Sequence, residues 1–205
     1  DWVDGKHDLL FLKLQNESPE FQQLYYSRQA DLQNTVFSCD NMLHVLDSMV
    51  AVIDPEMTRH TQRWGGTKIK WMQNVKLMRD FIAERCTLFD EGMNDCFSLT
   101  GPYALTVDVQ PAGAGEVDFN TLKLKTFPWT GNYYGGMSQK IQAKANAGWQ
   151  FSHWETKNAT AVISPTTIDA DAFLDFNVPD TLTAVFTLTS ATHEAKNPLA
   201  LRVFP

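Results

Sequence analysis

The first half of the chain places its apolar residues at the three- and four-residue spacing of α-helices. This pattern predicts four helices, over residues 19–33, 41–53, 55–64 and 68–85. Ser18 precedes Pro19 and is expected to cap the first helix, whose shared face is formed by Phe21, Leu24, Tyr25, Arg28 and Leu32. Four helices with short connections are typical of a compact bundle.

Two local signals separate the later helices. Pro55 follows Asp54 directly, which favours a new helix start because the carboxylate can accept amide hydrogens and proline needs no partner for its nitrogen. Gly65-Gly66 is expected to end that helix. An apolar stripe then runs down the last helix and is expected to be buried; its members are Trp71, Val75, Met78, Phe81 and Ile82.

After Pro102 the pattern changes to the alternation of β-strands. Tyr103, Leu105, Val107 and Val109 should face one way, and short alternating runs recur as far as Leu188. The sequence therefore predicts an α+β protein, with a helical segment followed by a small antiparallel sandwich or open barrel. The expected boundaries are 1–98 for the helical subdomain, 99–190 for the β module and 191–205 for a linker or the start of a further domain.

Composition narrows the possible partners. The net charge of -7 argues against unaided nucleic-acid binding, because a surface that follows phosphates needs a basic stripe. The apolar runs are too short to span a bilayer, so no transmembrane segment is expected. The chain begins at Asp1 without a charged-then-apolar signal segment, which suggests a mature product or a cut fragment.

Three cysteines, Cys39, Cys86 and Cys96, lack the paired spacing of zinc or redox motifs. A Cys86–Cys96 bridge is one interpretation in an oxidising compartment. Buried free thiols are the interpretation that we favour, because lone cysteines commonly serve as small core residues.

Arg59, His60 and Arg63 lie on or beside one helix face and could clamp an anion or a carboxylate. The more common alternative is structural pairing, with acids on neighbouring helices that hold the bundle together.

Neither a metal site nor another cofactor is expected in this chain. The five histidines are scattered, with no pair at ligand spacing. Asp169, Asp171 and Asp175 resemble a calcium loop but lack its central glycine and closing glutamate, so a solvated loop is the preferred interpretation.

A cluster of aromatic residues in the second half is the most distinctive chemical feature. Trp149 and Phe151 alternate correctly for burial, and Trp154 lies at a strand end. Trp129, Tyr133 and Tyr134 are expected in a loop bracketed by glycines, where they are either exposed, as we favour, or packed onto the sheet edge. Exposed rings of this kind bind sugar faces or protein partners. The sequence thus predicts ligand-binding candidates at Trp129, Tyr133, Tyr134 and Trp154, for a glycan or a surface protein.

The helical half resembles the helical C-terminal segment of bacterial CotH-type (spore-coat-H-like) atypical protein kinases. The similarity spans most of residues 7–85. It is carried by Leu14-Gln-Asn16-Glu-Ser-Pro19-Glu-Phe21, Arg28-Gln-Ala-Asp31-Leu32, Thr35-Val-Phe37, Glu56-Met57, His60, Arg63-Trp64, Trp71, Asn74-Val75, Leu77, Phe81 and Arg85. In that family the nucleotide- and metal-binding residues lie upstream of these helices. The resemblance therefore implies an upstream kinase-like lobe of the same parent chain as partner, and no catalytic residue here.

The second half resembles the divergent internalin B-repeat of bacterial surface proteins. The carriers are Leu105-Thr106-Val107, Gly113 to Val117, Asn120, Gly131-Asn132-Tyr133-Tyr134-Gly135-Gly136, Ile141-Gln142-Ala143, Gly148-Trp149-Gln-Phe151, Trp154 and Leu182-Thr-Ala-Val-Phe186. The tail from Asn197 to Pro205 is similar to the opening of a type IX secretion sorting domain. Both resemblances imply a secreted or cell-surface location in bacteria.

These observations lead to one main hypothesis and two alternatives. The main hypothesis is a non-catalytic C-terminal fragment of a CotH-like protein that acts as a structural scaffold and attachment module. The first alternative is a stand-alone glycan- or protein-binding module that uses the aromatic loop. The second is a helical enzyme with its site at Arg59 to Arg63. No glycine-rich phosphate loop or nucleophile motif in the sequence supports catalysis.

Overall fold

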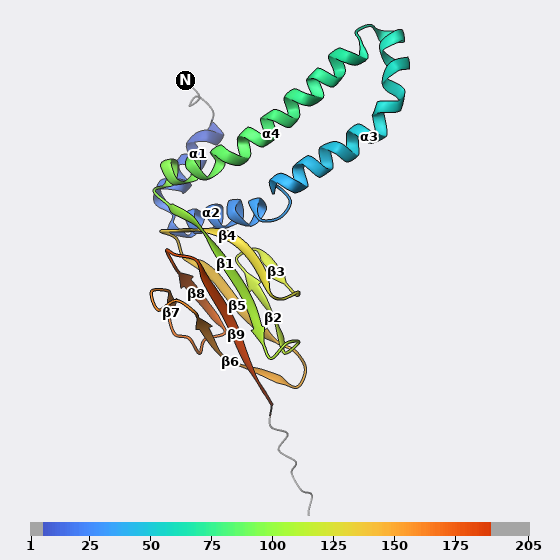
Figure 1. The fold of residues 1–205 in the computed structure, drawn as a ribbon. Helices are drawn as coiled ribbons and strands as arrows, with labels where there is room; N and C mark the ends of the chain where they lie inside the picture. The colour runs from blue at the N-terminus through green and yellow to red at the C-terminus, as the bar shows by residue number, and fades with distance from the viewer. Residues whose placement is uncertain (1–5, 190–205) are drawn as a thin grey trace, which may run out of the picture.

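The computed structural model describes residues 6–189 (Figure 1). Four helices come first: α1 Lys6–Glu17, α2 Pro19–Gln33, α3 Cys39–Trp64 and α4 Lys68–Phe97. Nine strands follow: β1 Thr100–Gln110, β2 Gly115–Phe119, β3 Leu122–Leu124, β4 Trp129–Gly135, β5 Gln139–Ala145, β6 Trp149–Thr156, β7 Val162–Ser164, β8 Asp171–Asp175 and β9 Asp180–Leu188. The predicted α+β class is confirmed.

Helix α2 begins where the sequence predicts. The Ser18 hydroxyl accepts a hydrogen bond from the Phe21 amide at 3.2 Å, and Pro19 occupies the first turn. On the predicted shared face, Leu24 and Arg28 are exposed, whereas the other three residues are half-buried. The buried residues of α2 lie on another side of the helix: Tyr26, Ser27, Ala30 and Asp31.

The predicted break at Asp54-Pro55 is also wrong. Helix α3 runs without interruption through Pro55, whose missing N–H removes one backbone hydrogen bond without ending the helix. Figure 1 shows the second half of α3 turning away from the direction of the first, as expected for an interior proline. Asp54 does not cap a new helix and instead accepts a hydrogen bond from Lys68 Nζ in α4 at 3.0 Å.

The helices do not form the predicted compact bundle. Helix α1 was not predicted, α4 continues to Phe97 rather than ending at 85, and α3 and α4 form an antiparallel hairpin that projects from the rest of the molecule (Figure 1). The stripe on α4 is therefore only partly covered. Trp71, Val75 and Ile82 are half-buried, whereas Met78 and Phe81 are 56% and 57% exposed.

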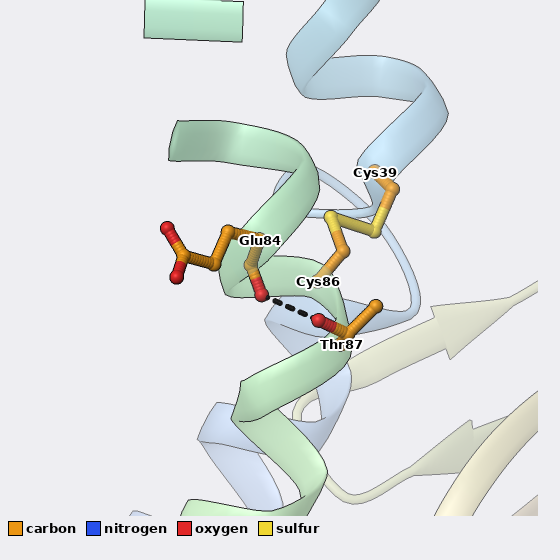
Figure 2. The surroundings of a disulfide bond; sticks show 4 residues. All are labelled: Cys39, Glu84, Cys86 and Thr87. Carbon is orange, nitrogen blue, oxygen red and sulfur yellow. Dashed lines mark hydrogen bonds between the residues drawn. A yellow bond between two sulfur atoms is a disulfide. The ribbon is translucent and has the colours of Figure 1, made fainter. Parts of the chain in front are cut away.

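A disulfide joins the two helices of the hairpin. Cys39 at the start of α3 is bonded to Cys86 in α4, across a sequence separation of 47 residues (Figure 2). Both interpretations of the cysteines were wrong, because the antiparallel arrangement brings Cys86 beside Cys39 and leaves Cys96 as an exposed free thiol. Beside the bridge, the Thr87 hydroxyl donates to the Glu84 carbonyl of the same helix at 2.8 Å.

The strands form a sandwich of two sheets, with strand orders β4-β1-β9-β6 and β3-β2-β5-β8-β7. Most pairings are antiparallel, but β1 pairs in parallel with β9. The predicted inward set on β1 is confirmed, since Leu105, Val107 and Val109 are buried and Tyr103 is half-buried on the same face. Residues predicted as loops at Trp129–Gly135 and Asp171–Asp175 are strands β4 and β8.

Within residues 6–189, no helix combines the length and the apolar character that a bilayer span requires.

We predict that the disulfide makes a large contribution to the stability of the hairpin. Closing a loop of 47 residues restricts the unfolded chain and stabilises the folded state by about 4 kcal/mol in the chain-entropy description. Cys86→Ser should therefore lower the free energy of unfolding by up to that amount, as measured by urea denaturation followed by circular dichroism. Cys96→Ser is the matched control and should change little; equal stability of the two variants would contradict the prediction.

Candidate functional site: the helix–sandwich junction

The helices meet the sandwich through a buried carboxylate on α2. Asp31 is fully buried, and its Oδ2 accepts hydrogen bonds from the Thr121 amide at 2.8 Å and the Thr121 hydroxyl at 2.6 Å. Its Oδ1 accepts from the Tyr133 hydroxyl at 2.9 Å. These donors belong to the β2–β3 turn and to β4, so one side chain joins α2 to both sheets.

Burial raises the pKa values of both Asp31 and Tyr133. Removal of Asp31 from water raises the pKa of its carboxyl, and the hydrogen bonds from Thr121 and Tyr133 oppose that rise. Burial, followed by the nearby charge of Asp31, raises the pKa of Tyr133 far above its ordinary value. The Tyr133 hydroxyl therefore keeps its proton and remains a donor to Asp31.

A second contact occupies the free edge of β4. Asn34, at the end of α2, donates from Nδ2 to the Asn132 carbonyl at 2.7 Å, and its Oδ1 accepts from the Asn132 amide at 2.7 Å. The carboxamide thus satisfies the backbone groups that a neighbouring strand would otherwise bind. Figure 1 shows α2 lying across the end of the sandwich beside β4.

Helix α4 contacts the same end of the sandwich. The Tyr134 hydroxyl donates to Asp90 Oδ1 at 2.5 Å, and burial together with this bond raises the pKa of Tyr134. Asn94 Nδ2 donates to the Gly101 carbonyl at 2.8 Å. The rings of Phe97 and Tyr26 lie 4.6 Å apart between their centroids, so aromatic packing joins α4 to α2 at the same place.

A small recess at this junction is lined by side chains of both helices, of β4 and of the disulfide. Its lining includes Asn34, Cys39, Cys86, Asp90 and Tyr134. The disulfide therefore lies directly beside the contacts that attach the hairpin to the sandwich.

The favoured interpretation of Trp129, Tyr133 and Tyr134 as exposed loop residues is wrong. Trp129, Tyr133 and Tyr134 belong to β4 rather than to a loop, and both tyrosines are buried while Trp129 is half-buried. Trp154 is buried too and donates from Nε1 to the Asp169 carbonyl at 2.9 Å. Trp149 and Phe151 are half-buried and pack against the core.

The glycines that indicated a loop have another role. A Cβ at Gly131 would overlap the Trp129 ring, and one at Gly135 would crowd Thr100 and Phe176. These glycines therefore make room inside a strand for large neighbours. The two tyrosines bind the chain's own helices, so their hydroxyls already have partners.

Arg59, His60 and Arg63 lie in the exposed last third of α3, near the tip of the hairpin. Arg59 Nη1 lies 3.4 Å from Glu56 Oε2 of the same helix. The Arg63 guanidinium lies 5.2 Å from the centroid of the Trp64 ring. The predicted pairing of Arg59 with a neighbouring helix is thus replaced by a contact within α3, and the anion clamp stays a prediction.

The three predicted loop carboxylates lie on or beside β8 and bind separate partners. Asp169 accepts from the Thr166 hydroxyl at 2.9 Å, Asp171 from Gln142 Nε2 at 2.7 Å and Asp175 from the Ser138 hydroxyl at 2.7 Å. Within residues 6–189, the structure shows no cluster of three or more side chains of the types that commonly bind metals.

The helices also present large apolar side chains to solvent. On α1 these are Leu9, Leu10, Phe11, Leu12 and Leu14. On the hairpin they include Val45, Met49, Val52, Ile53, Ile69, Met72, Leu77, Met78, Phe81 and Leu88. Exposed apolar surface of this extent is a common mark of an interaction site.

The comparison with family models supports the similarity of the helical half. Residues 4–88 match the model described as CotH kinase protein. The match covers α1, α2, α3 and most of α4, so the helical half of this chain is CotH-like. The match ends before the sandwich, and the resemblance of that part to an internalin B-repeat stays a prediction. The tail with the type IX similarity lies outside the described residues.

No curated protein and no solved structure matches the chain.

Sequence reasoning missed the junction because its residues are separated and ordinary in type. Asp31, Thr121 and Tyr133 lie 90 and 102 residues apart along the chain, and no motif connects them. The available signal was the position of Asp31 four residues after Ser27, which puts the carboxylate on one helix face with a small side chain.

We predict that Asp31→Ala weakens the junction strongly. The substitution leaves the Thr121 amide and the Tyr133 hydroxyl buried without their acceptor, which should cost about 2–4 kcal/mol in the free energy of unfolding. Urea denaturation measures this loss. Asp171→Ala, at an exposed carboxylate with one side-chain partner, is the control and should cost less than about 1 kcal/mol. Similar losses for both variants would refute the assigned role of Asp31.

Proposed function

We propose that this chain is a non-catalytic C-terminal part of a secreted or cell-surface bacterial CotH-like protein. In this role the helices complete a kinase-like fold, and the sandwich serves as a scaffold and attachment module. The observation that carries the proposal is the CotH match over the helices, together with the buried junction that joins those helices to the sandwich.

The junction suits a scaffold. Asp31, Asn34 and Asp90 each bind the sandwich through side-chain hydrogen bonds, and the rings of Tyr26 and Phe97 pack against each other. Several buried contacts at one interface favour a fixed orientation over a flexible connection. A load applied to the sandwich would therefore be transmitted to the helices.

The disulfide supports a location outside the cytoplasm. Disulfides persist in oxidising compartments and are rare where cellular thiols keep cysteines reduced. Cys39–Cys86 closes the projecting hairpin, which has little core of its own. A covalent link of this kind is useful for a helical pair that is exposed on most of its surface.

The apolar surface of α1 supports an upstream lobe as partner. Phe11 packs on Phe21 and Tyr25, with ring centroids 5.8 and 5.2 Å apart, which attaches α1 to α2. Leu9 and Leu12 share one side of α1 at a spacing of three, and Leu10 and Leu14 share a second side at a spacing of four. Because the apolar residues on both sides are exposed, α1 is expected to lie between α2 and a further part of the protein.

This proposal predicts a specific defect in assembly. The parent gene's upstream lobe, produced separately, should bind this chain in trans, and Leu10→Glu should weaken that binding by about tenfold or more. Isothermal titration calorimetry measures the affinity. Leu24→Glu on α2 is the matched control, because Leu24 and Leu10 are 55% and 58% exposed.

Two results would contradict the proposal. One is equal binding by the two leucine variants, which would show that α1 is not the docking surface. The other is a parent gene whose upstream region lacks the acidic nucleotide- and metal-binding residues of the CotH family, which would remove the kinase-like assignment.

A further inference from the structure

Helices α3 and α4 of the hairpin pack against each other along one apolar seam. Leu43, Leu46 and Val50 of α3 and Trp71 and Val75 of α4 are buried or half-buried where the two helices meet. Two ion pairs bridge one side of this seam: Asp47 with Arg79, and Asp54 with Lys68. We refer to the side of the hairpin that carries these pairs as the ionic flank.

A second apolar stripe lies on the opposite side. Ile53 and Met78 immediately precede Asp54 and Arg79, and a rotation of about 100° per residue directs them to the other side of the seam. Together with their neighbours they form a surface that we name the apolar flank. Its members run from Ile53 and Met78 beside the seam, through Met49 and Phe81, to Val45, Val52, Leu77 and Leu88 towards the outer side of each helix, and all are exposed.

The spacing of this stripe is that of a helix-packing seam. On α4, Leu77, Phe81 and Leu88 follow intervals of four and seven residues, and on α3, Val45, Met49 and Val52 follow four and three. Such intervals keep apolar side chains on one side of a helix that packs against another helix. The hairpin therefore carries two seams, one filled by its own helices and one exposed.

Charge is distributed unevenly along the hairpin. The tip, residues 56–70, has four basic and one acidic side chain, whereas the base of α4, residues 84–95, has four acidic and one basic. Between them, the charged residues Asp47, Lys76, Arg79 and Asp80 pair with one another. The apolar flank is thus bounded by a basic end and an acidic end.

When two copies of the hairpin lie antiparallel, the basic end of each faces the acidic end of the other. Seven residues separate Lys70 from Leu77, and seven separate Leu88 from Asp95, which is about 10 Å along the helix in each case. Two antiparallel α4 helices can therefore place Leu77 of one copy opposite Leu88 of the other and Lys70 opposite Asp95 in the same register. A parallel pair would instead bring like charges together.

We propose that the apolar flank binds the apolar flank of a second copy of this chain, with the two hairpins antiparallel about a two-fold axis near Phe81. The contact buries the exposed methionines, leucines and phenylalanines in a four-helix arrangement. Each basic tip then lies against the acidic base of the partner, which fixes the antiparallel orientation. This inference does not depend on the proposed function, because it rests on the hairpin alone.

Sedimentation velocity over a range of concentrations tests the contact. All proteins carry Cys96→Ser, which prevents dimers linked through the exposed thiol. The account predicts a reversible dimer whose dissociation constant rises by about tenfold or more in Met78→Glu. Met72→Glu is the control: Met72 lies seven residues before Arg79 on the ionic flank and is 57% exposed, against 56% for Met78. Its dissociation constant should change less than about twofold.

A charge exchange tests the orientation. Lys70→Glu should weaken the dimer, and Lys70→Glu combined with Asp95→Lys should restore it, because both symmetric pairs are re-formed with opposite polarity. If circular dichroism shows that Met78→Glu has lost helical structure, Leu77→Gln provides a second test of the apolar flank.

Several outcomes would overturn the proposal. They are a monomer at every concentration, equal weakening by Met72→Glu and Met78→Glu, and failure of the charge exchange to restore the dimer. A flank that becomes covered by an upstream part of a longer gene product, with no dimer, would overturn it as well.

Discussion

The buried carboxylate of Asp31 is the interaction on which the arrangement of the molecule depends. A carboxylate removed from water is costly unless hydrogen bonds replace its hydration, and Asp31 receives three, from Thr121 and Tyr133. These donors can satisfy it in only one position of α2 on the sandwich. The position of α2 in turn places Asn34 at the edge of β4 and Tyr26 against Phe97 of α4. The attachment of the hairpin follows from these contacts.

The sandwich and the hairpin are stabilised in different ways. The sandwich has a continuous apolar core made by both sheets, whereas the hairpin has a narrow seam and a disulfide. A helical pair with so little core depends on the covalent link at its base and on the junction beneath it. The same shortage of core leaves apolar side chains exposed, and such surfaces are where further protein is expected to bind.

Local patterns predicted much of the fold. Ser18-Pro19 marked the start of α2, Gly65-Gly66 the turn between α3 and α4, and the alternation from Tyr103 to Val109 the inner face of β1. These features depend on neighbours in the sequence, which a pattern can report. Pro55 was misleading because a helix supported by its partner can tolerate one missing hydrogen bond.

The junction itself could not be predicted in the same way. Tyr133 and Tyr134 between glycines suggested an exposed loop, because the sequence does not show that Gly131 and Gly135 leave room for rings within a strand. Asp31 looked like an ordinary helical acid, since its partners lie about half the chain away. The pairing of Cys39 with Cys86 likewise depends on the antiparallel hairpin rather than on spacing. Each of these features is determined by tertiary contacts.

Hydrogen exchange at the Asn132 amide tests the central claim most directly. This amide lies on the free edge of β4, and its hydrogen-bond acceptor is the side chain of Asn34 on α2. If α2 is fixed to the sandwich as described, the amide should be protected to a degree similar to the amides that join β1 and β4, and Asn34→Ala should abolish that protection. Exchange of the Asn132 amide in the unmodified protein at the rate of an unbonded edge amide would contradict the account.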